Sequence, residues 1–147
     1  MAVSDRKPPF RFSNVTRVGF DETDAQGVVY YGRYLPYFDH ARLEYHRNLG
    51  LTAMWQGARE FVMRAMTVEY EAPAVFDDLL EVFVRMTRMG RSSITFDCAA
   101  YRVDDDVLMC TSTQTLVFID TAARRPTAIP ADYRAALERF EAGEADA

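Results

Sequence analysis

The pattern of apolar and polar positions changes its period along the chain. Between residues 31 and 49, apolar side chains recur at spacings of three and four, as on one face of an α-helix. The stripe consists of Tyr34, Phe38, Ala41, Tyr45 and Leu49, and the polar residues mostly off it are Asp39, Arg42, His46 and Arg47. A start between Gly32 and Leu35 puts Pro36 in the first turn, where a missing N–H costs no intrahelical bond. The sequence therefore predicts one long helix that ends at Gly50.

Outside this helix, short runs of alternating or β-branched residues predict strands. The expected strands cover residues 10–20, 60–70, 79–89, 92–103 and 107–120. Short polar turns join the last three, which favours an antiparallel meander. A short helix is expected from Pro130 to about Phe140. The long helix is the only element able to cover the sheet, so the predicted fold class is α+β, with an antiparallel sheet of about five strands wrapped around one central helix.

Composition limits the domain count and the class of partner. A chain of 147 residues with 49% apolar residues fits a single domain over 1–147, with a core at about 10–138 and a tail at 141–147. The net charge of −5 argues against a general nucleic-acid binder. Cys98 and Cys110 form no CxxC motif and are expected to be free thiols in a reducing compartment, which favours the cytoplasm. We expect no signal peptide and no membrane span.

An acidic turn stands just before the long helix and carries the candidate chemistry. It runs from Asp21 to Asp24, and Gly27 then allows a bend before a short apolar-aromatic run. A carboxylate at this position lies near unpaired backbone N–H groups and the positive end of the helix dipole. An anionic group and a potential oxyanion hole would then be within reach of each other. The residues alone leave a second interpretation open, in which Asp24 only shapes the turn or caps the helix.

Three motifs give the chain a family resemblance. They are DETDAQGVVYYGRYLPYFDHAR at 21–42, MTVEYEAPAVFDDLLEV at 66–82 and AIPADYR at 128–134. With them, the chain resembles the hotdog-fold acyl-CoA thioesterases of the 4-hydroxybenzoyl-CoA thioesterase type, especially the branch typified by the small thioesterase of the bacterial Tol–Pal cluster. The resemblance extends from Phe12 to Ala136 and implies the hotdog version of the predicted α+β fold.

The resemblance also assigns roles to residues of the acidic turn. It implies that Asp24 is the catalytic carboxylate, acting either as a nucleophile or as a general base. It implies that the backbone N–H of Tyr31, seven residues later, polarises the thioester carbonyl, and that Gly27 allows the close turn between them. Asp21 is expected only to shape the loop. Three aromatic residues are candidates for lining an acyl pocket, namely Tyr30, Tyr34 and Trp55.

Binding of the CoA nucleotide is expected at the turn between the two middle strands. The resemblance implies contacts from Arg91 and Ser92, with Arg88 and Ser93 nearby. The family often has a second cation after Arg91, where this chain has Ser92. CoA would be part of the substrate, and no metal or redox cofactor is expected.

Other kinds of catalytic site find no support in the sequence. His40 and His46 are six residues apart, which does not suit a metal pair on one helix face, so we interpret both as surface or packing residues. A GxSxG nucleophile elbow is absent, and Cys110 has no supporting motif.

We expect a cytoplasmic acyl-CoA thioesterase. The resemblance implies that it forms a homodimer or homotetramer with active sites at the subunit boundary. A curled sheet with an exposed edge favours such pairing. Three alternatives stay open: a hydratase or dehydratase of acyl thioesters, a non-catalytic acyl-CoA-binding module, and a hydrolase of acyl-carrier-protein thioesters. The first would need a His with an acidic residue, and the segment from Phe10 to Pro36 contains no His.

Overall fold

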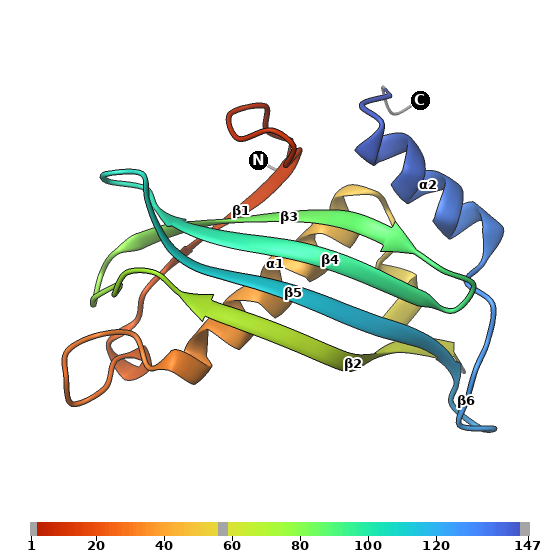
Figure 1. The fold of residues 1–147 in the computed structure, drawn as a ribbon, viewed down its shortest axis with the longest axis horizontal. Helices are drawn as coiled ribbons and strands as arrows, with labels where there is room; N and C mark the ends of the chain where they lie inside the picture. Colours follow the sequence, from red (N-terminus) through yellow and green to blue (C-terminus); the bar gives the residue numbers. More distant parts are fainter. Residues whose placement is uncertain (1–2, 56–58, 145–147) are drawn as a thin grey trace.

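A computed structural model describes residues 3–55 and 59–144 of the chain, as one curved sheet with a long helix against it (Figure 1). The strands are β1 (Phe12–Arg17), β2 (Arg59–Tyr70), β3 (Leu79–Met89), β4 (Ser93–Arg102), β5 (Val107–Asp120) and the short β6 (Arg125–Pro126). The α-helices are α1 (Tyr34–Asn48) and α2 (Ala131–Glu141), and short 3₁₀ turns cover Phe20–Glu22, Tyr31–Arg33 and Thr52–Trp55. The predicted long helix, meander and final helix are confirmed.

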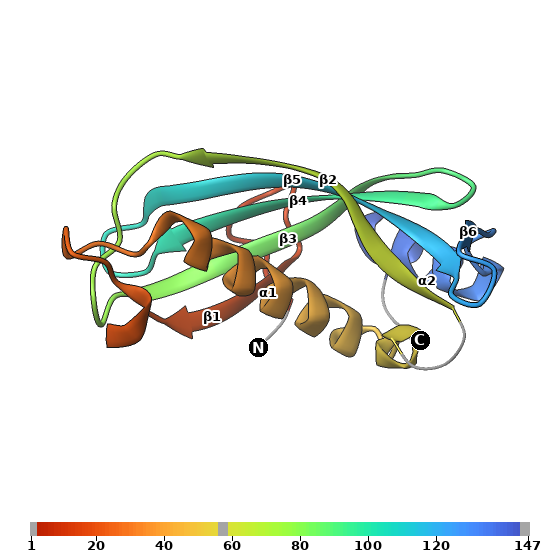
Figure 2. The same cartoon turned by 90° about the horizontal axis from the view of Figure 1, so that it is seen from below.

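The sheet has the order β1-β3-β4-β5-β2, all antiparallel, with β6 paired to the end of β5. Figure 2 shows α1 lying along one face of this sheet. Register shifts on β2, β3 and β4/β5 mark bulges, which bend and twist strands. The sheet can therefore curl around the helix, and the predicted α+β class with about five main strands is confirmed.

The predicted helical stripe faces the core. Tyr34, Phe38, Ala41 and Tyr45 are buried, while Leu49 packs against the core from a partly buried position. Gly50 follows the helix with a φ of 73°, a conformation in which a side chain is strained.

Two polar residues of α1 lie deeper than the stripe predicts. Arg42 and His46 are both buried. His46 is covered by α2: its Nε2 lies 2.7 Å from the Tyr133 hydroxyl, and the two rings stack. Arg42 instead donates a hydrogen bond to Gln114 on β5. The buried sector of α1 is therefore wider than the stripe.

The C-terminal helix reaches one residue into the segment expected to be a tail. Glu141 is half-buried, and its carboxylate accepts hydrogen bonds from the Tyr45 hydroxyl at 2.6 Å and the Met86 amide at 2.9 Å. Residues 56–58, and the residues 145–147 of the expected tail, lie outside the described residues. No helix among the described residues is long and apolar enough to cross a membrane.

Burial of His46 makes stability depend on pH. Burial is the main cause that lowers the pKa of His46 from 6.5 to about 4. Between these values the unfolded chain binds a proton that the folded chain does not, so the free energy of unfolding falls as the pH is lowered. We expect a loss of about 3 kcal/mol from this group between pH 7 and pH 4.

Urea unfolding of the wild type, His46→Gln and His40→Gln at pH 7, 5.5 and 4.5 measures this effect. His40 is exposed, so its substitution is a matched control. His46→Gln should have the shallower dependence on pH, and His40→Gln should follow the wild type. Parallel profiles for all three proteins would contradict the role given to His46.

Candidate active site

The acidic turn folds into a tight bend that presents Asp24. The Asp24 amide donates to the Val28 carbonyl at 2.9 Å, and the Gly27 amide donates to the Asp24 carbonyl at 2.9 Å. Gly27 has a φ of 81°, which favours glycine, so the predicted need for this residue in the turn is confirmed. One carboxylate oxygen of Asp24 accepts from the Gln26 amide at 2.8 Å. The bend thus fixes a half-buried carboxylate a few residues before the helix.

Glu22 anchors this loop, a role that the sequence did not reveal. Its Oε1 atom accepts from the Gly19 amide and from the Tyr37 hydroxyl, both at 2.7 Å. Its backbone carbonyl also accepts from the Tyr30 amide at 2.9 Å. Glu22 therefore joins the start of the loop to its end and to α1. The signal available was a Glu three residues after Gly19, the spacing of a capping box.

A cavity of about 310 Å³ lies between the acidic turn, the helix start and the end of β2. Its walls are mostly apolar or aromatic, and Asp24, Gln26 and Glu71 are the other residues that line it. The lining residues are Asp24, Gln26, Val28, Val29, Tyr31, Tyr34, Tyr70, Glu71, Ala72 and Pro73. The structure therefore brings Asp24 and Tyr31 to the same cavity.

Backbone donors are available where the helix begins. Tyr31 and Gly32 start a 3₁₀ turn whose first bond is donated by the Arg33 amide to the Tyr30 carbonyl at 2.8 Å. The Tyr31 and Gly32 amides precede that bond, so no carbonyl within the turn accepts from them. The positive end of the helix dipole adds to their attraction for a developing negative charge. A polarised oxygen atom could be bound here.

The aromatic residues proposed for the acyl pocket differ in position. Tyr34 lines the cavity. Tyr30 is not among the lining residues, and it packs against Tyr31 with ring centroids 4.4 Å apart. The side chain of Trp55 lies outside the described residues.

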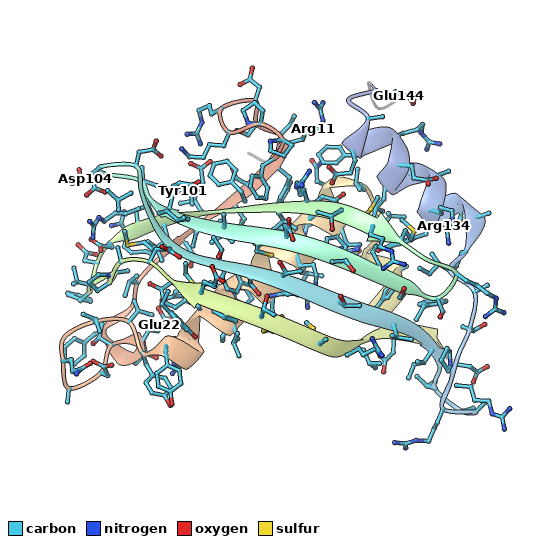
Figure 3. All side chains as sticks on the ribbon, in the orientation of Figure 1. Arg11, Glu22, Tyr101, Asp104, Arg134 and Glu144 are labelled. Carbon is cyan, nitrogen blue, oxygen red and sulfur yellow. The ribbon has the colours of Figure 1, made fainter. Side chains whose placement is uncertain are left out.

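The expected nucleotide-binding residues lie at the opposite end of the sheet from Asp24. Arg88, Arg91 and Ser92 are at or beside the β3–β4 turn, whose Gly90 carbonyl accepts from Arg134 Nη2 at 2.6 Å. Figure 3 shows Arg134 at one end of the molecule and Glu22, from the acidic turn, at the other. Strand β3 separates the two ends by about 30 Å. Within one chain, the structure does not bring Arg91 and Asp24 together.

Neither cysteine is suited to act as a nucleophile. Burial raises the pKa of both the Cys98 and Cys110 thiols to about 12. The thiolate is the nucleophilic form, so both groups are unreactive near neutral pH. Among residues 3–55 and 59–144, no group of three His, Cys, Asp or Glu side chains is placed to hold a metal ion.

A second cavity, of about 330 Å³, lies where both α-helices end. Arg11 and Arg139 line it, together with Asn48 at the end of α1 and Gly143 just after α2. Cations are favourable beside the C-terminal ends of helices, because the dipoles place negative charge there. The negative ends of the two helices account for the presence of two arginines here, and we assign no ligand to this cavity.

Comparison with known proteins places the chain in a family. Residues 18–137 match the family model of the thioesterase-like superfamily. The chain is 31% identical over 133 residues to the acyl-CoA thioesterase YbgC of Haemophilus influenzae, covering 88% of this chain and 96% of that protein. It is 34% identical over 116 residues to the acyl-CoA thioester hydrolase YbgC of Escherichia coli, covering 78% and 86% respectively.

The fold of a solved structure agrees with this assignment. The 1,4-dihydroxy-2-naphthoyl-CoA thioesterase from Synechocystis superposes with a TM-score of 0.81 at 20% identity, covering 88% of this chain and 97% of that chain. At that identity the likeness concerns the fold alone. The chain therefore belongs to the thioesterase-like superfamily, has the hotdog fold and is a thioester hydrolase.

Proposed function

We propose that this hydrolase acts on acyl-CoA and releases a carboxylate and free CoA, with Asp24 as its catalytic carboxylate. The observation that carries the proposal is the common cavity of Asp24 and Tyr31, beside backbone amides that no carbonyl of the turn occupies. The acyl-CoA substrates in the names of the two YbgC relatives support the same substrate class.

The chemistry needs few groups because a thioester is already activated. The acyl carbonyl lies in the cavity with its oxygen toward the Tyr31 amide, which stabilises the negative charge of the tetrahedral intermediate. Asp24 either attacks the carbonyl carbon and forms a mixed anhydride that water then cleaves, or it takes a proton from the attacking water. In both routes the C–S bond breaks, a C–O bond forms, and a proton from water ends on the CoA thiol.

The geometry of Asp24 suits either role. One carboxylate oxygen is held by the Gln26 amide, and the other has no partner among the described residues. An oxygen atom oriented by its neighbour, yet free of its own hydrogen bond, can attack or accept a proton. The hydratase alternative finds less support, because neither histidine is among the residues that line this cavity.

Thiol release from a panel of acyl-CoA thioesters tests the function. The panel should contain short and long aliphatic acyl groups and aromatic ones, with the same acyl groups on acyl carrier protein in parallel. Enzyme-dependent release of CoA is the expected result. Binding of acyl-CoA without any thiol release would favour the non-catalytic binding module, and release only from the carrier protein would favour that alternative.

We propose a homodimer, or a tetramer of two dimers, formed through the free edge of β2. Strand β2 ends the sheet order and pairs only with β5 among the described strands. Val62 and Met63 on this strand are 37% and 39% exposed. An unpaired edge strand with exposed apolar residues favours pairing with another chain. Antiparallel pairing of two β2 strands would set the β3–β4 turn of one copy at the Asp24 end of the other. The expected nucleotide contacts would then come from the second subunit.

Replacing Arg91 with Ala is expected to raise KM for acyl-CoA by about tenfold and to change kcat less. The exposed guanidinium would contact a CoA phosphate, and this contact is the same in the ground state and the transition state. Steady-state kinetics of thiol release measures both constants. Arg47→Ala removes an exposed arginine from α1 and serves as the control. Unchanged constants for Arg91→Ala would remove this residue from nucleotide binding.

We also propose a reducing compartment such as the cytoplasm for this enzyme. Cys98 and Cys110 are both free and buried, which fits a protein that does not depend on disulfides.

A further inference from the structure

One hydrogen bond joins the end of β2 to the turn that carries the proposed oxyanion donor. The Tyr70 hydroxyl donates to the backbone carbonyl of Tyr31 at 2.8 Å. Both residues line the cavity that contains Asp24. The Tyr70 ring also makes edge contacts with the Tyr31 ring, at 6.4 Å between centroids, and with the Tyr34 ring, at 5.8 Å. Tyr70 therefore contacts the helix start through both its ring and its hydroxyl.

We propose that Tyr70 is a positioning residue for hydrolysis, which holds the Tyr31 backbone in the orientation that stabilises the oxyanion. This inference rests on the proposed function. Tyr31 is the first residue of a single 3₁₀ turn, a structure with poor hydrogen-bond geometry, and its side chain is 61% exposed. The bond from the Arg33 amide to the Tyr30 carbonyl restrains the peptide group that carries the Tyr31 N–H. The bond from Tyr70 on the neighbouring strand restrains the next peptide group, which carries the Tyr31 carbonyl and the Gly32 N–H.

The same bond affects a second amide. The Tyr31 carbonyl and the Gly32 N–H belong to one peptide group, so a donor on the oxygen polarises the N–H at the other side. Gly32 is the second amide that precedes the first bond of the turn. The Tyr70 hydroxyl thus orients the Gly32 amide and strengthens its donor character, and it fixes the backbone on the carbonyl side of Tyr31.

Tyr70 keeps its proton under ordinary conditions. Burial is the main cause that raises the pKa of Tyr70 above its usual value. The hydroxyl therefore remains a hydrogen-bond donor through the neutral range. Since the residue is 49% exposed, removing only its oxygen atom should leave the fold intact.

The test compares Tyr70→Phe with the wild type in the thiol-release assay. We expect kcat to fall about tenfold, since a slightly misplaced donor loses part of its effect on the transition state, while KM stays within about twofold. Thermal unfolding should be unchanged. Tyr101→Phe is the matched control, because Tyr101 is in a different part of the sheet, where its ring lies 4.2 Å from Lys7 Nζ. It should retain wild-type kinetics.

A second variant separates positioning from wall packing. Tyr70→Leu removes the ring as well, so it should share the loss in kcat and add a rise in KM. If Tyr70→Phe keeps a kcat within about twofold of the wild type, or raises only KM, the positioning role is overturned while the hydrolase function stands. A wild type that releases no thiol from any substrate overturns both proposals.

Discussion

Asp24→Asn is expected to lower kcat/KM for acyl-CoA hydrolysis by about 10³-fold. The amide is almost the same size as the carboxylate and can still accept from the Gln26 amide, so the bend should keep its shape. It is neither a good nucleophile nor a base, and positioned proton transfer alone contributes about 10² to 10⁴-fold. The thiol-release assay at saturating and limiting substrate measures the loss. Unchanged thermal unfolding would show that chemistry, not folding, is affected.

Asp21→Asn is the matched control for this prediction, because it makes the same change three residues away in the same loop. Asp21 is exposed and does not line the cavity, so wild-type kinetics are expected. Equal rates for Asp24→Asn and the wild type would remove Asp24 from the mechanism. The two roles of Asp24 can also be separated, since a burst of thiol ahead of the carboxylate product is expected only for the covalent route.

Gln114→Leu is expected to lower the free energy of unfolding by about 3 kcal/mol. Gln114 is fully buried, and its side-chain oxygen accepts a hydrogen bond from Arg42 Nη1. Arg42 is 8% exposed, its Nη2 atom donates to Asp39 at 2.9 Å, and its Nε atom is already without an acceptor among the described residues. A leucine would leave a buried cation with one acceptor fewer, which is costly in a low-dielectric interior. Urea unfolding at pH 7 measures the loss.

A double-mutant cycle with Arg42→Met identifies the source of this cost. The methionine removes the charge while it keeps most of the apolar volume, so the single variant should lose less stability than Gln114→Leu. The double variant should recover to within about 1 kcal/mol of the wild type, because a buried polar pair can be replaced by apolar residues at little net cost. Additive losses would show that the two side chains are not coupled.

The periodic elements were predictable because they depend on neighbours along the chain. The stripe from Tyr34 to Tyr45 needs only a helical period, and the strand at 79–89 needs only alternation between short turns. The Gly27 bend was predictable for the same local reason. For Asp24 the residues alone left two interpretations open, and the prediction of catalysis came from the motif around it.

Contacts between distant segments were not predictable in this way. Arg42 is a polar residue off the helical stripe, and its burial depends on Gln114, which lies 72 positions later. The hydrogen bond from Tyr70 to Tyr31 spans 39 positions. The separation of Arg91 from Asp24 also follows only from the sheet topology, since no local pattern states which ends of the strands meet. Contacts between single residues that are far apart in the chain produce no periodic pattern in one sequence.

The proposed oxyanion donor is a main-chain group, so the backbone and the side chain of residue 31 have separate functions. Any amino acid other than proline would offer the same N–H, so the identity of the side chain is not tied to the reaction. That side chain is nevertheless part of the cavity wall. Over evolutionary time, descendants of such an enzyme can exchange it to admit other acyl groups while their rate of bond cleavage is preserved.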